Sequence, residues 1–217
     1  KLVTGVQTCA LPISLKSTDD RTAYLELFHG KTIAFKDMAL SILPHLMKQS
    51  AEKQNMKEEI VILTATSGDT GKAAMAGFAD VPGTRIIVFY PKDGVSYVQK
   101  RQMITQKGEN TCVIGIEGNF DEAQTGVKQL FTDRDFNDQL AASGVYLSSA
   151  NSINIGRLVP QIMYYFKAYQ DLIHLGTIHQ GDEINFCVPT GNFGDILAGY
   201  LALLLGLPIG RLLVASN

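Results

Sequence analysis

The sequence predicts an α/β protein with mostly parallel sheets that carry helices on both faces. Short runs rich in β-branched and aromatic residues recur along the chain, and turn residues bound each run. Helix-length stretches that mix apolar and polar residues separate these runs. Strands that alternate with helices of this length are typical of βαβ units, whose crossovers place helices against the sheet.

The expected elements follow one another along most of the chain. A first helix is expected from about residue 34 to residue 53. Strands are expected at residues 59–65, 85–91, 111–118, 145–150 and 184–189. Helices are expected at residues 71–79, 96–107, 120–133 and 157–173. The longest apolar run, at residues 200–207, is much shorter than the roughly 20 residues that span a bilayer, so we interpret it as a buried helix.

The composition is typical of a folded, soluble protein. Of the 217 residues, 46% are hydrophobic and 18% are charged, which is enough for one large core or two small ones. The net charge of −2, from 19 basic and 21 acidic side chains, gives no general attraction to nucleic acid or to an anionic membrane. We therefore expect a cytoplasmic protein that acts on a small molecule, with no nucleic-acid or membrane partner.

The cysteines indicate neither a disulfide framework nor a metal site. Cys9, Cys112 and Cys187 lie far apart, and none stands in a CxxC pattern or near a spaced histidine. Cys112 and Cys187 lie in apolar runs, so we expect both to be small, buried core residues.

The first fourteen residues differ in character from the rest. They lack the charged start and the continuous apolar stretch of a signal peptide, and they resemble translated sequencing-adapter read-through. We predict that residues 1–14 are a non-native segment. Because the chain also stops abruptly at residue 217, we expect it to be a fragment that is inactive by itself.

Three loops follow expected strands and precede expected helices: residues 67–70 (SGDT), 151–154 (NSIN) and 191–195 (GNFGD). In parallel sheets, ligands bind beyond the carboxyl ends of the strands, and helix starts offer backbone amides to a phosphate or carboxylate. The first loop does not match a nucleotide-binding P-loop, because Thr66 and Ala73 stand where Gly and Ser or Thr are required. Each loop alone is equally consistent with an ordinary turn and helix cap.

Lys36 is the candidate nucleophile. A lone lysine is usually a solvated surface residue. Lys36, however, follows Ala34 and Phe35, and a lysine against such an apolar wall loses hydration, which favours the neutral, nucleophilic amine.

The order of the motifs is more specific than any one of them. The chain contains, in sequence, FHGKTIAFKD, TSGDTG, PKDGVS, NSINIGRLVPQ and PTGNFGD. From about Tyr24 to Asn217 it resembles the threonine synthases of the bacterial and fungal branch, a family of fold type II pyridoxal-phosphate enzymes. One departure is Lys31, where many relatives have proline, a change expected to alter loop stiffness more than chemistry.

This resemblance implies a tryptophan synthase β-like architecture. Residues 15–55 and 150–217 would form part of a large cofactor-binding domain, and residues 56–149 a small inserted α/β domain. It implies a carbon–oxygen lyase of threonine biosynthesis, which converts O-phospho-L-homoserine and water into L-threonine and phosphate by γ-elimination and β-addition. Pyridoxal 5'-phosphate would be the cofactor.

The resemblance also implies roles for individual residues. Lys36 would hold the cofactor as a Schiff base and move protons on the substrate. The cofactor phosphate would be bound by Gly191, Asn192, Phe193, Gly194 and Asp195. The substrate carboxylate would be bound by Ser67, Gly68 and Thr70, and the substrate phosphate by Asn151, Ser152 and Arg157.

Two roles stay open for Asp69. The resemblance places it beside the 3-hydroxyl of the cofactor ring, where an ionised carboxylate would be repulsive. The alternative is that Asp69 caps the following helix.

Two rival functions remain. Another fold type II lyase, such as a serine or threonine dehydratase or a cysteine synthase, would share the lysine and the glycine loop but would lack a second phosphate site. A non-catalytic relative that binds pyridoxal phosphate or phosphometabolites is the other alternative, and the retention of Lys36 argues against it.

Overall fold

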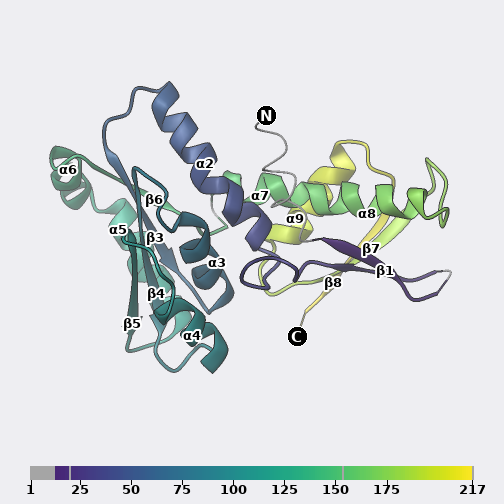
Figure 1. Cartoon of the computed structure of the whole chain (residues 1–217), viewed down its shortest axis with the longest axis horizontal. Helices are drawn as coiled ribbons and strands as arrows, with labels where there is room; N and C mark the ends of the chain where they lie inside the picture. Colours follow the sequence, from purple (N-terminus) through teal and green to yellow (C-terminus); the bar gives the residue numbers. More distant parts are fainter. Residues whose placement is uncertain (1–12, 20, 153, 217) are drawn as a thin grey trace. The chain divides into compact units, whose positions relative to one another are not determined.

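A computed structural model describes residues 13–19, 21–152 and 154–216. They form two compact units, which we name the terminal unit (the described residues between 13 and 29 and between 155 and 216) and the central unit (the described residues between 30 and 154) (Figure 1). The segment predicted to be non-native, residues 1–14, lies outside the described residues as far as residue 12, and so does Cys9. Ser14 is the first residue of β1.

The central unit is built on a four-stranded sheet with the order β5-β4-β3-β6, in which all neighbours are parallel. The strands are β3 (Glu59–Ala65), β4 (Thr84–Pro91), β5 (Thr111–Ile116) and β6 (Val145–Ser149). At the centre of the sheet, Ile62 pairs with Ile86 on one side and with Ser148 on the other. The predicted α/β class with a parallel sheet is confirmed.

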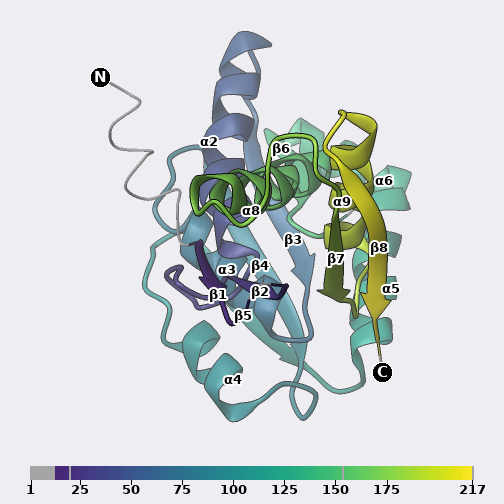
Figure 2. The same cartoon turned by 90° about the vertical axis from the view of Figure 1, so that its right-hand side faces the viewer.

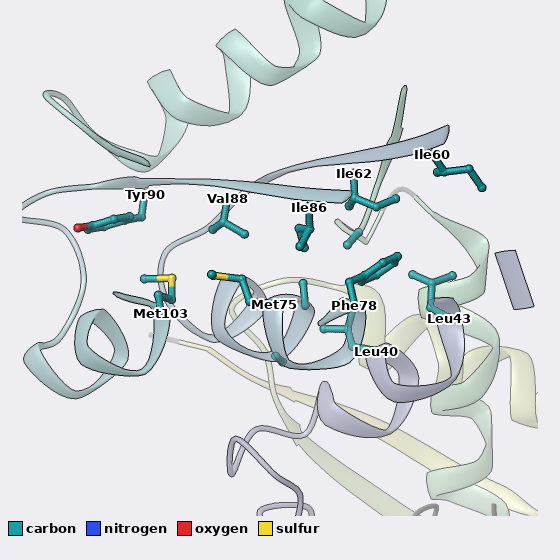
Figure 3. Packing of buried hydrophobic residues seen from close by; sticks show 13 residues of the cluster. Leu40, Leu43, Ile60, Ile62, Met75, Phe78, Ile86, Val88, Tyr90 and Met103 are labelled. Carbon is teal, nitrogen blue, oxygen red and sulfur yellow. The ribbon is translucent and has the colours of Figure 1, made fainter. Parts of the chain in front are cut away.

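Helices cover both faces of this sheet. The central unit contains α2 (Asp37–Lys53), α3 (Asp69–Phe78), α4 (Tyr97–Ile104), α5 (Phe120–Thr132) and α6 (Arg134–Ala142). Side chains from α2, α3 and α4 share one core with the sheet, and side chains from α5 share the other. Strands β3 and β4 reach both cores because successive side chains point to opposite faces. Figure 3 shows Ile62, Ile86 and Val88 of the first core pointing toward Met75 and Phe78.

The described residues of the terminal unit form two small sheets and four helical segments. β1 (Ser14–Ser17) pairs antiparallel with β2 (Ala23–Glu26), and β7 (Ile184–Pro189) pairs parallel with β8 (Ile209–Ala215), as Figure 2 shows. The helical segments are α7 (Ile155–Leu158), the 3-10 helix η1 (Val159–Gln161), α8 (Ile162–His174) and α9 (Gly194–Leu204). The described elements contain no helix that is long and apolar enough to cross a membrane.

The predicted helix at residues 157–173 is wrong as a single element. It is divided into α7, η1 and α8, with Pro160 in the 3-10 segment. Proline lacks a backbone N–H, so it is tolerated in the first turn of a helix and not in the interior of a continuous one.

The helix predicted at residues 200–207 forms only as far as Leu204, and the prediction that it is buried is wrong. α9 ends at Leu204, and Leu204 and Leu205 are 64% and 67% exposed. The buried face of α9 is lined by Ala198, Gly199 and Ala202, so only that side of the helix meets the described part of the terminal unit.

Cys112 and Cys187 are exposed, so the prediction that both are buried is wrong. Each lies on a strand whose burial alternates along the sequence, and each occupies an outward position. An apolar run therefore identified the strand correctly but did not identify the face on which the cysteine lies.

The bounds of the compact units differ from those of the predicted domains, which divide the chain at residues 55 and 149. Residues 30–55 pack with the central unit, where α2 lies against α3. Gly77 of α3 allows the closest approach, because a Cβ atom there would collide with the carbonyl oxygen of Leu40. The assignment of residues 15–55 and 150–217 to one larger domain stays a prediction.

We expect Gly77→Ala to destabilise the protein by about 1–3 kcal/mol, because the added methyl meets the backbone of α2, which cannot move as a side chain can. The matched control is Gly126→Ala in α5, where a Cβ would meet nothing within 4 Å. That change should be neutral or stabilise by up to about 1 kcal/mol. Denaturant unfolding of both variants measures the difference, and equal stabilities would contradict the close helix contact.

Candidate functional site

Lys36 stands at the end of a tight turn that leads into α2. We name this turn, residues 30–37, the lysine turn. Asp37 closes this turn, because its carboxylate accepts the backbone N–H of Thr32 at 2.7 Å and the hydroxyl of the same residue. Gly30 lies so close to Asp37 that a Cβ would overlap the carboxylate. Ile33 has a φ of 55°, which a β-branched residue rarely adopts. The turn explains why α2 begins at Asp37 and not at the predicted residue 34.

The side chain of Lys36 is half-buried, and its Nζ lies 4.2 Å from the centre of the Phe35 ring. Ala34 is 4% exposed, so the apolar surroundings expected from the sequence are present. An amine beside an aromatic face at the edge of the core is partly shielded from water yet accessible to a ligand. Partial burial disfavours the charged form of the amine, whereas the aromatic face favours it, so burial is the feature that suits a nucleophilic lysine.

The loop between β3 and α3, together with the first two residues of α3, is named the 66–70 loop. The buried side chain of Thr66 holds it in place. Its Oγ1 accepts the backbone N–H groups of Gly68 and Gly71 at 2.9 and 2.8 Å. Gly68 has a φ of 134°, and the amide of Gln99 fills the space that a Cβ would need. Within this loop Ser67 is exposed and Thr70 is half-buried. The loop is thus a fixed turn that presents Ser67 to solvent at the carboxyl end of the sheet.

Asp69 is the first residue of α3. Gly68 occupies the cap position and makes no side-chain cap hydrogen bond. The first-turn N–H of Gly71 is bound by Thr66 and not by Asp69. Instead, the Asp69 carboxylate accepts Nε2 of Gln99 at 2.9 Å and pairs with Nζ of Lys72 at 3.0 Å. Gln99 must present its NH₂ group to Asp69, because its Oε1 accepts the backbone N–H of Ser96.

These contacts keep Asp69 ionised. Burial raises the pKa of Asp69, but the hydrogen bonds from Gln99 and Lys72 and the positive charges of Lys72 and Lys36 outweigh it, so the net pKa is below the ordinary value. The charge of Lys36 acts on Asp69, and both residues belong to the central unit. An anion of fixed charge therefore lies near the candidate nucleophile.

Asn151 links the carboxyl ends of β6 and β3. Its Nδ2 donates to the carbonyl oxygen of Ala65 at 2.8 Å, and its backbone N–H donates to Oγ of Ser149 at 3.1 Å. Nδ2 of Asn154 donates to the carbonyl oxygen of Ser149. Ser152, next along the chain, is exposed. Lys36, the residues of the 66–70 loop, Asn151 and Ser152 all belong to the central unit.

The terminal unit contains the 191–195 loop. The buried Thr190 anchors its start, because its N–H donates to the carbonyl oxygen of Ala215 and its Oγ1 donates to the carbonyl oxygen of Val188. A Cβ at Gly191 would meet nothing within 4 Å. α9 begins at Gly194 without a side-chain cap, after the exposed Phe193. An uncapped helix start with open space before it is a good setting for an anion.

Arg157 belongs to the terminal unit and is 2% exposed. Burial lowers its pKa to about 10, while Tyr164 acts in the opposite direction. The guanidinium is therefore cationic at neutral pH. Its backbone carbonyl accepts Nε2 of the buried Gln161.

Comparison with known proteins identifies the family. The model of the family described as pyridoxal-phosphate dependent enzyme matches residues 19–216. The chain belongs to the pyridoxal-phosphate-dependent enzymes. The lysine turn, the 66–70 loop and the 191–195 loop all lie within the matched residues.

Within this family the chain is similar to threonine synthases. It is 48% identical over 193 residues to the threonine synthase of Pseudomonas aeruginosa, a match that covers 89% of this chain and 39% of that protein. It is 44% identical over 199 residues to human threonine synthase-like 1, which covers 89% of this chain and 26% of the relative. The predicted resemblance to the threonine synthase family is confirmed.

Solved structures agree with the sequence comparison. A PLP-bound threonine synthase from Brucella melitensis matches with a TM-score of 0.80 and 44% identity, over 94% of this chain and 42% of that one. The Escherichia coli threonine synthase matches with a TM-score of 0.79 and 38% identity, over 98% and 46%. The chain thus spans less than half the length of these relatives.

The sequence motifs did not reveal every residue that shapes these loops. Thr66, Lys72, Gln99 and Tyr165 were not predicted as site residues. A signal for Gln99 was present, because Ser96 and Gln99 have the spacing of a capping box, and both hydrogen bonds of that box form. The contact between Gln99 and Asp69 joins residues 30 positions apart, which spacing alone does not predict.

We expect Asp69→Asn to lower stability at neutral pH by about 1 kcal/mol or more, because the Asp69 side chain is 41% exposed but its partner Lys72 is 7% exposed and would lose the charge that compensates its burial. The folded-state pKa of Asp69 is depressed, so its contribution is complete above the ordinary value of 3.8 and is lost as the pH falls through the lower folded value. Denaturant unfolding between pH 7 and pH 3 should show the difference shrink with acid. Asp138→Asn, an exposed carboxylate on α6, is the control. A difference that is independent of pH would contradict an ionised, paired Asp69.

Proposed function

We propose that the protein is a threonine synthase, which converts O-phospho-L-homoserine and water into L-threonine and phosphate with pyridoxal 5'-phosphate as cofactor. The observation that carries this proposal is the placement of Lys36, half-buried against Phe35 and close enough for its charge to lower the pKa of Asp69, in a chain whose family uses this cofactor. Relatives named threonine synthase, 48% identical in one case, support the choice of reaction.

The described residues fit the proposed cofactor. The amine of Lys36 can form a covalent bond to an aldehyde carbon, and the backbone amides of the 191–195 loop suit a phosphate dianion at the start of α9. When bound, pyridoxal phosphate supplies an electron sink that stabilises negative charge at the substrate Cα. Orientation and proton transfer are left to the protein.

Besides its amine, the substrate has two anionic groups, a carboxylate and a phosphate. Two sets of residues match them. Ser67, Gly68 and Thr70 are assigned to the carboxylate, because they lie at the start of α3, where Thr66 fixes the turn. Asn151, Ser152 and Arg157 are assigned to the phosphate. Arg157 is suited to this role because a planar guanidinium donates two parallel hydrogen bonds to phosphate oxygens.

Lys36 would carry the protons of the reaction. Phosphate leaves from Cγ, which gains a proton, while Cβ loses one hydrogen and receives the hydroxyl derived from water. A single amine that removes a proton from Cα and transfers protons at Cβ serves these steps without a second base, provided that it is released from the cofactor when substrate binds. Asp69 stays ionised, so we assign it to the part of the site near the Lys36 amine, where a negative charge is favourable.

The proposed second phosphate site distinguishes this function from its rivals. A serine or threonine dehydratase, or a cysteine synthase, would act on unphosphorylated amino acids, and a non-catalytic relative would bind cofactor or phosphometabolite without turnover. Incubation of the complete protein with O-phospho-L-homoserine, and in parallel with L-serine and L-threonine, separates the three. Release of phosphate with formation of L-threonine supports the proposal, whereas keto-acid formation from serine or threonine would favour a dehydratase.

We expect Lys36→Ala to abolish the near-visible absorbance band of the bound cofactor and its covalent attachment after borohydride reduction. Without the side-chain amine, no bond to the cofactor aldehyde forms at this position. Lys31→Ala, an exposed lysine in the same turn, is the matched control and should keep both signals. Mass spectrometry of the reduced peptides locates the modified lysine. A band and a reducible adduct that persist in Lys36→Ala would assign the cofactor to another lysine.

We expect Arg157→Ala to lower kcat/KM for O-phospho-L-homoserine by about ten- to hundredfold, the loss of a charge-assisted hydrogen bond worth about 1.5–3 kcal/mol. The cofactor band should remain. Arg157→Lys should show a smaller loss because it keeps the charge without the planar fork, and Arg211→Ala, an exposed residue on β8, should show none. Loss of the cofactor band in a folded Arg157→Ala variant would place Arg157 at the cofactor phosphate instead.

A further inference from the structure

We propose that Tyr165 is a positioning residue that fixes the 191–195 loop for the phosphate of the cofactor. The inference rests on the proposed function for the role of that loop, and it adds a residue that none of the sequence motifs assigned. Tyr165 lies on α8 and is 3% exposed.

The hydroxyl of Tyr165 donates a hydrogen bond to the backbone carbonyl oxygen of Asp195 at 2.8 Å. The carboxylate oxygen Oδ1 of the same residue is 3.5 Å away, so the carbonyl is the better acceptor. Asp195 is the last residue of the loop motif and lies in the first turn of α9. The hydrogen bond uses a carbonyl, so it orients this turn without consuming an N–H donor.

The ring of Tyr165 contacts the elements on both sides of the loop. It meets Phe186 of β7 edge-on, with 4.8 Å between ring centroids and 65° between the planes. On the other side it packs on Gly199 of α9, where a Cβ would lie 2.6 Å from the ring. One buried side chain thus touches the strand before the loop, the first turn after it and the second turn of the same helix.

This arrangement explains why the loop would be preorganised. Backbone amides bind an anion well only when they already point at the binding position, because ordering a loop on binding costs conformational entropy. Gly191 gives the loop freedom, while Tyr165 and the anchored Thr190 remove that freedom at its two ends. Tyr165 is not expected to contact the cofactor itself.

The hydroxyl of Tyr165 remains a donor over the working pH range. Burial raises the pKa of Tyr165 far above its ordinary value, and the negative charge and hydrogen bond of Asp195 raise it further. The loop support is therefore independent of pH, unlike a support that uses a histidine or a carboxylate.

The test compares two tyrosines on the same helix. Tyr165→Phe removes the hydroxyl that holds Asp195. Tyr169→Phe is the matched control, because Tyr169 is also buried and its hydroxyl accepts the backbone N–H of Gly181 at 2.8 Å, outside the 191–195 loop. Both variants lose one buried hydroxyl hydrogen bond, so their loss of thermal stability should be similar.

Binding is measured on the complete apoprotein with pyridoxal 5'-phosphate and with pyridoxal, which has the aldehyde but no phosphate. Tyr165→Phe should weaken binding of pyridoxal 5'-phosphate by about three- to tenfold and leave binding of pyridoxal within about twofold of the unmodified protein. Tyr169→Phe should bind both as the unmodified protein does. Equal weakening for the two ligands, or equal effects of the two variants, would reduce Tyr165 to a structural residue and overturn the proposal.

Hydrogen exchange of the apoprotein provides an independent readout. Peptides that cover residues 190–198 should exchange faster in Tyr165→Phe than in Tyr169→Phe. If the unmodified protein binds pyridoxal 5'-phosphate no better than pyridoxal, the assigned role of the loop is wrong, and faster exchange would still show that Tyr165 fixes it. Unchanged exchange together with unchanged binding in Tyr165→Phe would overturn the inference about Tyr165 and would leave the proposed function untouched.

Discussion

The parallel pairing of β3 with β4 on one side and β6 on the other is the constraint on which the central unit depends. Alternate residues of β3 supply both cores: Ile62 faces α2 and α3, and Leu63 faces α5. Parallel pairing also brings the carboxyl ends of the strands to one edge of the sheet. Thr66, directly after β3, and Asn151, two residues after β6, are therefore neighbours at the same edge, and Asn151 bonds to the end of β3 through Ala65. The loops proposed to meet the substrate are consequences of strand order.

At this edge of the sheet, a buried positive charge is paired with a negative one. Lys72 is 7% exposed and would be costly to bury alone, and Asp69 supplies the opposite charge at 3.0 Å. Gln99 adds a neutral donor whose orientation is fixed by the capping box of α4. The carboxylate therefore has a defined position and a defined ionisation state before any ligand binds. Direct contact between this carboxylate and an anionic ring oxygen would be repulsive, so an assignment of Asp69 to the region near the Lys36 amine is physically more consistent.

Much of the fold could be predicted from the sequence, because local patterns determine it. The runs that predicted strands β3 to β7 are rich in β-branched residues, and each strand forms within a few residues of its predicted position. The short β1, the helix α6 and β8 lack an equally clear pattern and were not predicted. The start of α2 was misplaced because the carboxylate of Asp37 stabilises a turn that competes with the helix. The exposure of Cys112 depends on which face of β5 is covered, and that information lies in α5, not in the residues around the cysteine.

For the candidate site, the sequence predicted which loops matter but not what holds them. Each of the three loops that follow a strand is fixed by a hydroxyl or amide side chain bonded to backbone: Thr66 to Gly68 and Gly71, Asn151 to Ala65, and Tyr165 to Asp195. The first of these bonds is local, but the other two join residues 86 and 30 positions apart, and no single-sequence motif encodes such a pairing. Rigid supports of this kind hold binding groups near their working geometry before the ligand arrives. A substitution in a supporting residue should therefore weaken binding without removing any group that touches the ligand.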